Sequence, residues 1–184
     1  MMLFYQIFVR RFSLAYFSPT RSSALCPDLF LVLAIDSSGS IDANEFAVQT
    51  LGYGAAFQNK AVQRAIASAG VVDVAAIYWA DAELSIQIIP WHRLRSALDA
   101  DAFGAVLMTT QRRVVGDTDI GNGLNTAINM IEATRSCSRR AIINISGDGE
   151  ESLSAKRKFH IPLVVARKRA AELGIIVNGL VIEN

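Results

Sequence analysis

The chain has 184 residues, of which 52% are hydrophobic, so it is long enough for one domain with a sizeable core and too short to expect two. Its 18 basic and 17 acidic residues leave a formal net charge of +1, which argues against a nucleic-acid-binding surface. No uninterrupted apolar run approaches the roughly 18 residues of a membrane span, so no transmembrane segment is predicted.

The first 28 residues are predicted to be an N-terminal extension or degenerate targeting segment, and residues 29–184 the folded domain. Residues 1–24 are apolar, contain arginine and serine and lack acidic residues, as targeting segments do. The match is imperfect, because the first apolar run precedes Arg10 and Arg11 instead of following them. We favour an exported protein, periplasmic or extracellular, with a cytoplasmic location as the alternative.

Two cysteines, Cys26 and Cys137, are too few for a disulfide scaffold and too far apart for a CxxC metal motif. Each precedes a predicted strand, so a bridge at the amino end of the sheet is conceivable in an oxidising compartment. Two free thiols are the favoured interpretation.

The first predicted strand, Leu31–Asp36, is an apolar run that stops abruptly at an acid, as buried parallel strands do. Asp42 and Glu45 then form a capping-box pattern that opens a helix. Gln58-Asn59 interrupts this helix before a shorter helical turn.

A second strand is predicted at residues 71–80 and a third at 84–89, joined by the short link Asp81-Ala82 as an antiparallel hairpin at the sheet edge. Pro90 is predicted to end the third strand. A helical pattern then runs over residues 91–109, followed by a polar linker at 110–113.

The second half continues the alternation of strands and helices. It predicts, in order, a glycine-bounded loop (116–121), a helix to about residue 134, a strand (141–145), a basic helix (163–173) and a fifth strand (175–182). The fold class is therefore α/β, a three-layer, doubly wound and mainly parallel sheet with one antiparallel edge strand. In the strand order 3-2-1-4-5, Asp36 and Asp148 face each other at the carboxyl ends, where ligands of such sheets bind.

Five oxygen-bearing side chains are predicted to form a metal site at this edge. They are Asp36, Ser38, Ser40, Thr118 and Asp148. An all-oxygen set of this kind suits a small hard divalent cation in octahedral geometry, so Mg²⁺ or Mn²⁺ fits best. Two carboxylates at most neutralise the ion, which then stays electrophilic and keeps a position open. An Asp or Glu of a partner protein is the natural occupant.

These residues resemble a known site. Asp36-Ser-Ser-Gly-Ser40 after an apolar strand, Thr118 in Gly116-Asp-Thr-Asp and Asp148 in Ser-Gly-Asp-Gly look like the metal-ion-dependent adhesion site (MIDAS) of von Willebrand factor type A domains. The likeness covers about residues 29–184 and implies that fold. Further motifs resemble a bacterial, mostly proteobacterial, exported family of unknown function: Gly52-Tyr-Gly-Ala-Ala-Phe57, Pro90-Trp91 and Ile143-Asn-Ile-Ser-Gly-Asp-Gly149.

The chain departs from that family in two ways. Type A domains usually continue past the fifth strand with a helix, a sixth strand and a final helix, so the domain is expected to be C-terminally incomplete, with an uncovered edge rich in Ile and Val. Glu150-Glu151 and Lys156-Arg157-Lys158 also follow the second aspartate, where that bacterial family is richer in Asn and Gly.

Other polar residues receive simpler interpretations. Asp117 and Asp119 are expected to be solvated loop acids, and otherwise to tune metal affinity or repel wrong partners. The chain's two histidines, His92 and His160, are distant in sequence and are expected at the surface or at helix starts.

Three functions compete on the sequence alone. The leading one is a metal-dependent protein-binding module that is not an enzyme. A magnesium-dependent phosphotransferase or phosphatase is second, but Ser38 stands where such enzymes place a second carboxylate as general acid. The third is an assembly component that uses the fold without metal.

Overall fold

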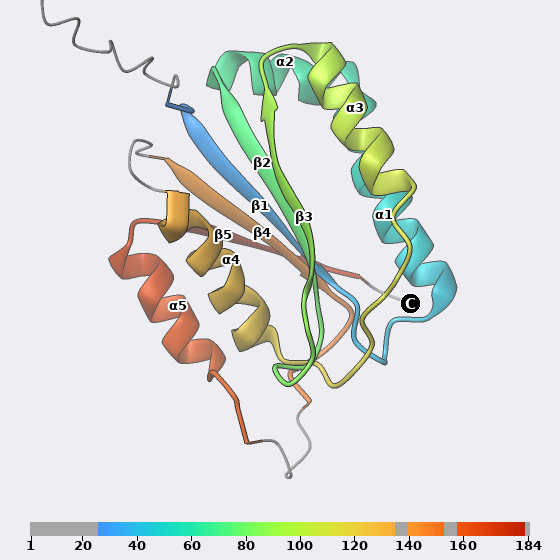
Figure 1. Cartoon of the computed structure of the whole chain (residues 1–184), viewed down its shortest axis with the longest axis vertical. Helices are drawn as coiled ribbons and strands as arrows, with labels where there is room; N and C mark the ends of the chain where they lie inside the picture. Colours follow the sequence, from blue (N-terminus) through green and yellow to red (C-terminus); the bar gives the residue numbers. More distant parts are fainter. Residues whose placement is uncertain (1–25, 135–139, 153–157, 183–184) are drawn as a thin grey trace, which may run out of the picture.

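A single five-stranded sheet organises the molecule. The computed structural model describes residues 26–134, 140–152 and 158–182, and its strands lie in the order β3-β2-β1-β4-β5 (Figure 1). The strands are β1 (Leu29–Asp36), β2 (Val72–Trp79), β3 (Gln87–Leu94), β4 (Ala141–Gly147) and β5 (Ile176–Val181). All neighbours are parallel except β2 and β3. The predicted order and the antiparallel edge strand are confirmed.

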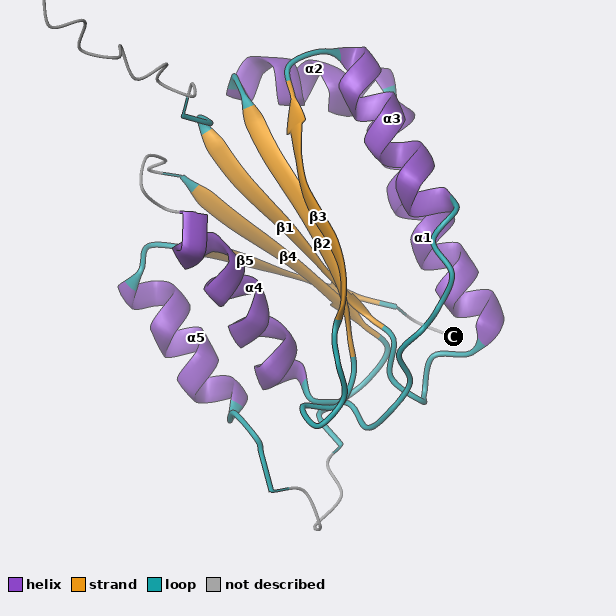
Figure 2. Cartoon of the chain, in the orientation of Figure 1, coloured by secondary structure: helices purple, strands orange, loops and turns teal. Residues whose placement is uncertain are grey.

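Helices cover both faces of the sheet, which makes three layers (Figures 1 and 2). One face carries α1 (Ala43–Gln58), α2 (Lys60–Ala69) and α3 (Ala97–Met108), and the other carries α4 (Ile120–Thr134) and α5 (Leu163–Glu172). Within the described residues, no helix has the length and apolarity that crossing a bilayer requires. Residues 1–25 of the predicted targeting segment, Cys137 and the pair Lys156-Arg157 lie outside the described residues.

The central strand β1 is buried on both sides because its residues alternate between the two faces. Leu33 and Ile35 belong to the core under α1 and α3, whereas Val32 and Ala34 belong to the core under α4 and α5. Burial of each large side chain contributes about 1.5–3 kcal/mol. The carboxyl end of β1, where Asp36 lies, is therefore held in a fixed position by packing on both sides.

The capping box predicted at the start of α1 is present. The Asp42 carboxylate accepts the Glu45 backbone N–H at 2.8 Å, and the Asp42 N–H donates to the Glu45 carboxylate at 2.6 Å. Such reciprocal bonds satisfy two backbone donors that the helix itself leaves unpaired.

Three boundaries around β3 differ from the sequence-based expectation: the start of the strand, its end and the start of the next helix. The strand runs from Gln87 to Leu94, and Pro90 lies inside it instead of ending it. The register with β2 shifts between Val74 and Ala76, opposite Pro90, and an edge-strand irregularity is where a residue without an N–H is tolerated. The predicted helix over residues 91–109 therefore begins only at Ala97, where Ser96 Oγ caps it by accepting the Asp99 N–H at 3.3 Å.

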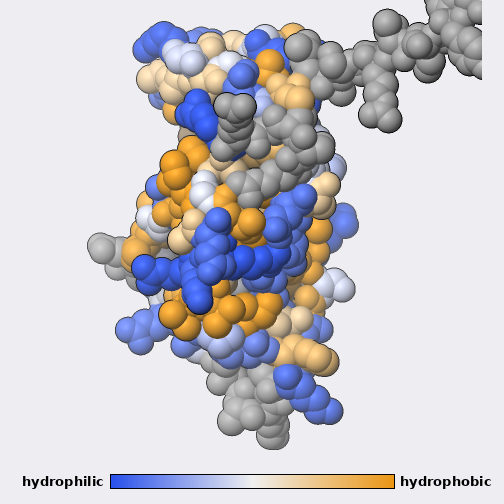
Figure 3. All heavy atoms as spheres, turned by 90° about the vertical axis from the view of Figure 1, so that its left-hand side faces the viewer, coloured by the Kyte–Doolittle hydropathy of each residue, from blue (hydrophilic) through white to orange (hydrophobic). Residues whose placement is uncertain are grey.

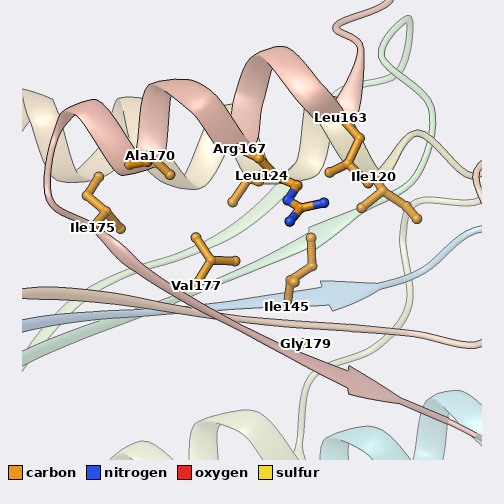
Figure 4. A pocket seen from close by; sticks show the side chains of 10 residues that line it. Ile120, Leu124, Ile145, Leu163, Arg167, Ala170, Ile175, Val177 and Gly179 are labelled. Atoms are coloured by element: carbon orange, nitrogen blue, oxygen red, sulfur yellow. The ribbon is translucent and has the colours of Figure 1, made fainter.

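Within the part of the chain that the structure describes, the opposite edge of the sheet is uncovered, as predicted. Among the described residues β5 pairs only with β4, and most of its residues are exposed. An apolar hollow of about 450 Å³ lies between β5, α4 and α5, with the Arg167 side chain reaching into it (Figure 4). On the α5 side of the molecule, hydrophilic atoms form a band flanked by hydrophobic ones (Figure 3).

The state of Cys26 differs from the sequence-based expectation. Cys26 is disulfide-bonded, so the favoured interpretation of two free thiols is wrong. The only other cysteine in the sequence, Cys137, lies outside the described residues.

Candidate metal centre

The candidate centre forms where β1 and β4 end side by side. Asp36 is the last residue of β1, and Asp148 directly follows β4. The two strands are parallel neighbours, with Ile35 opposite Ser146. Because β2 flanks β1 on its other side, the chain order reverses here, which is where α/β sheets bind ligands.

Four of the five predicted side chains are joined by one chain of hydrogen bonds. The Ser38 N–H donates to Asp36 Oδ1 at 2.7 Å, and the Ser38 and Ser40 hydroxyl oxygens lie 3.0 Å apart. The Ser40 hydroxyl in turn donates to Asp148 Oδ1 at 2.9 Å. A loop of only five residues thus turns alternate side chains toward the second carboxylate, as the Asp-x-Ser-x-Ser spacing predicts.

The centre also contains the second carboxylate oxygen of Asp36, Oδ2. Asp36 is fully buried, and among the described residues Oδ2 has no hydrogen-bond partner. Burial raises the pKa of this carboxyl to about 6, against a bond from Ser38 that lowers it, and the charge of Asp148 raises it further. A buried, unpaired carboxylate oxygen is costly, and a divalent cation is the partner that would satisfy it. The residues therefore fit a hard cation.

Thr118 lies on the third loop of the centre and is buried. The Gly39 N–H donates to the Gly116 carbonyl at 2.7 Å, which ties this loop to the Asp36 loop. Thr118 also forms a two-bond antiparallel bridge with Ser152 (3.1 and 3.0 Å), which ties the loop to the chain after β4. These contacts bring the three predicted segments together, while coordination by the Thr118 hydroxyl stays a prediction.

An arginine that the sequence analysis left in a polar linker holds the Asp36 loop in shape. The Arg112 guanidinium donates to the carbonyls of Ser37 (3.0 Å), Ser38 and Ile41 (2.7 Å). It also lies over the Phe46 ring, 5.9 Å from its centroid. With these carbonyls bound to Arg112, the Ser38 hydroxyl lies against the Ser40 hydroxyl, which contacts Asp148. No sequence signal separates Arg112 from the adjacent Arg113.

Gln49 is a second supporting residue that sequence reasoning missed. Its amide donates to the Asp36 carbonyl at 3.3 Å and accepts from the Ser146 hydroxyl at 3.0 Å. It therefore joins the ends of β1 and β4 from α1. A signal existed here, since Gln49 is a buried polar residue three positions after Phe46 on the apolar face of its helix.

The structure contradicts one of the simpler interpretations and confirms another. Asp119 is fully buried rather than solvated, and burial raises the pKa of its carboxyl. His160 is exposed and lies three residues before α5, as expected, and its Nδ1 lies 3.6 Å from Asp119 Oδ1. His92 has no such acidic neighbour in the described contacts: its Nδ1 lies 2.8 Å from the Pro90 carbonyl, and its ring packs against Phe103.

Solved structures share this fold at low identity. The pilus adhesin SpaC from Lactobacillus rhamnosus GG, in its open conformation, matches with a TM-score of 0.56 and 16% identity over 84% of this chain and 24% of its own. Proximal thread matrix protein 1 from the mussel byssus, with a zinc-occupied MIDAS motif, matches with a TM-score of 0.57 and 16% identity over 84% and 37%. An aerotolerance-related membrane protein from Bacteroides fragilis matches with a TM-score of 0.52 and 18% identity over 83% and 66%.

The chain spans about a quarter of the adhesin and under two fifths of the matrix protein, so the likeness concerns one domain of each. It shows that the fold is of the von Willebrand factor A type. A search of curated proteins found no match. The model of one family matches residues 25–184, nearly the whole chain, and its description agrees with the prediction of a family of unknown function, while the bacterial and exported character of that family stays a prediction. The chain belongs to the family "Protein of unknown function (DUF1194)".

Proposed function

We propose that this chain is a metal-dependent protein-binding module. Asp36, Ser38, Ser40, Thr118 and Asp148 hold Mg²⁺ or Mn²⁺, and an Asp or Glu of a partner completes the coordination sphere. The observation that carries the proposal is Asp36 Oδ2, a buried carboxylate oxygen without a partner beside a cluster of hydroxyls and a second carboxylate.

Charge favours binding over catalysis. Two carboxylates at most neutralise a divalent ion, and the three hydroxyls add no negative charge. The bound ion therefore stays electrophilic and attracts a further anionic ligand. A protein carboxylate meets that demand without a chemical step. The fold neighbours support this direction, since two of them are described as a pilus adhesin and a thread matrix protein.

The proposal is tested with Mn²⁺ as the probe. Mn²⁺ bound with an open coordination position carries exchanging water, which increases the longitudinal relaxation of bulk water protons. Wild-type protein is expected to show this enhancement, and a short Asp-containing peptide at millimolar concentration should reduce it by displacing the water. Asp36→Ala should bind Mn²⁺ about 100-fold more weakly or worse.

Glu150→Gln is the matched control, because it removes one exposed negative charge two positions from Asp148 and should leave Mn²⁺ binding unchanged. Undiminished Mn²⁺ binding by Asp36→Ala would overturn the proposal. Calorimetry that detects neither Mg²⁺ nor Mn²⁺ binding would favour the metal-independent assembly component. Turnover of a generic phosphate ester that is lost in Asp36→Asn would favour the phosphatase.

A further inference from the structure

A second group of metal-ligating side chains lies on the far side of the Thr118 loop. Asp119, Glu151 and His160 each offer one ligand atom, and these three atoms all lie within 4.8 Å of one another. They come from three separate stretches of chain: the start of α4, the stretch after β4 and the stretch before α5. Asp119 Oδ1 and His160 Nδ1 are 3.6 Å apart. Two ligands that share one tetrahedral zinc ion are separated by roughly 3.3–3.5 Å.

The carboxylate of Asp119 is the member of the group with an unpaired, buried oxygen. It is fully buried, Oδ1 accepts the Asn122 N–H at 2.9 Å, and Oδ2 has no hydrogen-bond partner among the described residues. Glu151 is half-buried and accepts the Gly121 N–H at 3.2 Å. The His160 side chain is 32% exposed, so an ion can reach the group from solvent.

The three stretches are held together independently of any ion. The Thr118–Ser152 bridge fixes the residues next to Asp119 and Glu151. Gly121 fixes the third stretch, because a Cβ at this position would overlap the Ile161 carbonyl oxygen, so α4 and the residue after His160 are in direct contact. The ligand positions are therefore largely preformed.

We propose that Asp119, Glu151 and His160 bind a divalent transition metal, Zn²⁺, in a site separate from the oxygen-only centre at Asp36. Two carboxylates balance the charge of the ion, and an imidazole nitrogen selects zinc over Mg²⁺, which prefers oxygen ligands. Three protein ligands leave a fourth position to water. The ion would link Asp119, at the start of α4, to Glu151 and His160, which lie near the two ends of the connection between β4 and α5.

The test titrates Zn²⁺ into untagged, full-length protein in saturating Mg²⁺, with Asp36→Ala as the background that removes the oxygen-only centre. The protein has two histidines, so their ring proton signals in NMR spectra are assigned with one variant. One equivalent of Zn²⁺ should shift the His160 signals and stop their titration with pH, while the His92 signals stay unchanged. Asp36→Ala should retain this response.

His160→Gln is expected to weaken Zn²⁺ binding by about 100-fold or more, since even the loss of a residue that only supports a ligand costs roughly 10- to 100-fold. Glu151→Gln should weaken it in the same direction, and Glu150→Gln, its exposed neighbour, should not. His160→Gln with wild-type zinc affinity would overturn the proposal. Loss of all zinc binding in Asp36→Ala would assign the zinc to the oxygen-only centre and overturn it equally.

Discussion

Two adjacent residues, Thr118 and Asp119, belong to clusters of opposite character. Thr118 lies with the oxygen-only centre of Asp36, Ser38, Ser40 and Asp148, whereas Asp119 contacts His160. The first cluster is built on the ends of two central strands and is braced by Arg112, and the second is built from loops that a backbone bridge and a glycine contact hold together. If both proposals hold, one short loop positions ligands for a hard ion on one side and for a softer ion on the other.

Asp36→Asn should produce the largest difference in metal binding between the two clusters. It should remove Mg²⁺ binding and leave Zn²⁺ binding intact. It should also stabilise the metal-free fold at pH 8 by about 3 kcal/mol, because the native pKa of about 6 lies above the unfolded value of 3.8.

The sign of this stability change follows from how tightly the folded and unfolded states bind the Asp36 proton. Between pH 4 and 6 the native state holds the Asp36 proton more tightly than the unfolded chain, so the wild type without metal loses stability as pH rises through this window. Urea denaturation in chelator at pH 4 and pH 8 measures the difference, which should be small at pH 4 and large at pH 8. A destabilised Asp36→Asn at pH 8 would contradict the burial argument.

Arg112→Ala should weaken Mg²⁺ binding by roughly 10- to 100-fold, because the loop carbonyls lose their donors and the Ser38 and Ser40 hydroxyls lose their orientation. Loss of charged hydrogen bonds to carbonyls should also lower the free energy of unfolding by about 2–3 kcal/mol. Zinc binding should not change. Calorimetry and urea denaturation measure these effects, with Arg113→Ala as the exposed neighbouring control; equal effects of both variants would show that Arg112 acts only through its charge.

Gly147→Ala should have the smallest effect, a loss of up to about 10-fold in Mg²⁺ affinity. A Cβ at Gly147 would lie 2.9 Å from Asp36 Oδ2, so the carboxylate must move slightly. Gly149→Ala is the control, since a Cβ there has no heavy atom of another residue within 4 Å. If calorimetry gives both variants wild-type affinity, Asp36 Oδ2 does not bind the ion.

The sequence predicted the sheet and the first cluster because both rest on local patterns. The apolar run that stops at Asp36 and the strand that leads to Asp148 define two parallel strands, and chain topology then places their ends together. The error at Pro90 arose because an edge-strand irregularity follows from pairing with β2, which no local pattern reveals.

The second cluster could not be read from the sequence, since its members have no periodic spacing. Asp119 and His160 lie together where Gly121 allows α4 to contact Ile161, the residue after His160. Arg112 was missed for a similar reason: three of its hydrogen-bond partners are backbone carbonyls 71 to 75 residues earlier, and any residue type supplies a carbonyl. Contacts to the main chain leave no trace in the identity of the partner residues.

That property of Arg112 bears on how the centre can change. Arg112 binds the loop through three carbonyls and the Ser37 hydroxyl, and none of these bonds uses the side chain of Ser38 or Ser40. Ser38 and Ser40 could therefore be exchanged for other ligating residues while the loop keeps its course. The metal preference of the centre should then be open to redesign, and to evolutionary drift, through single substitutions that leave the supporting framework untouched.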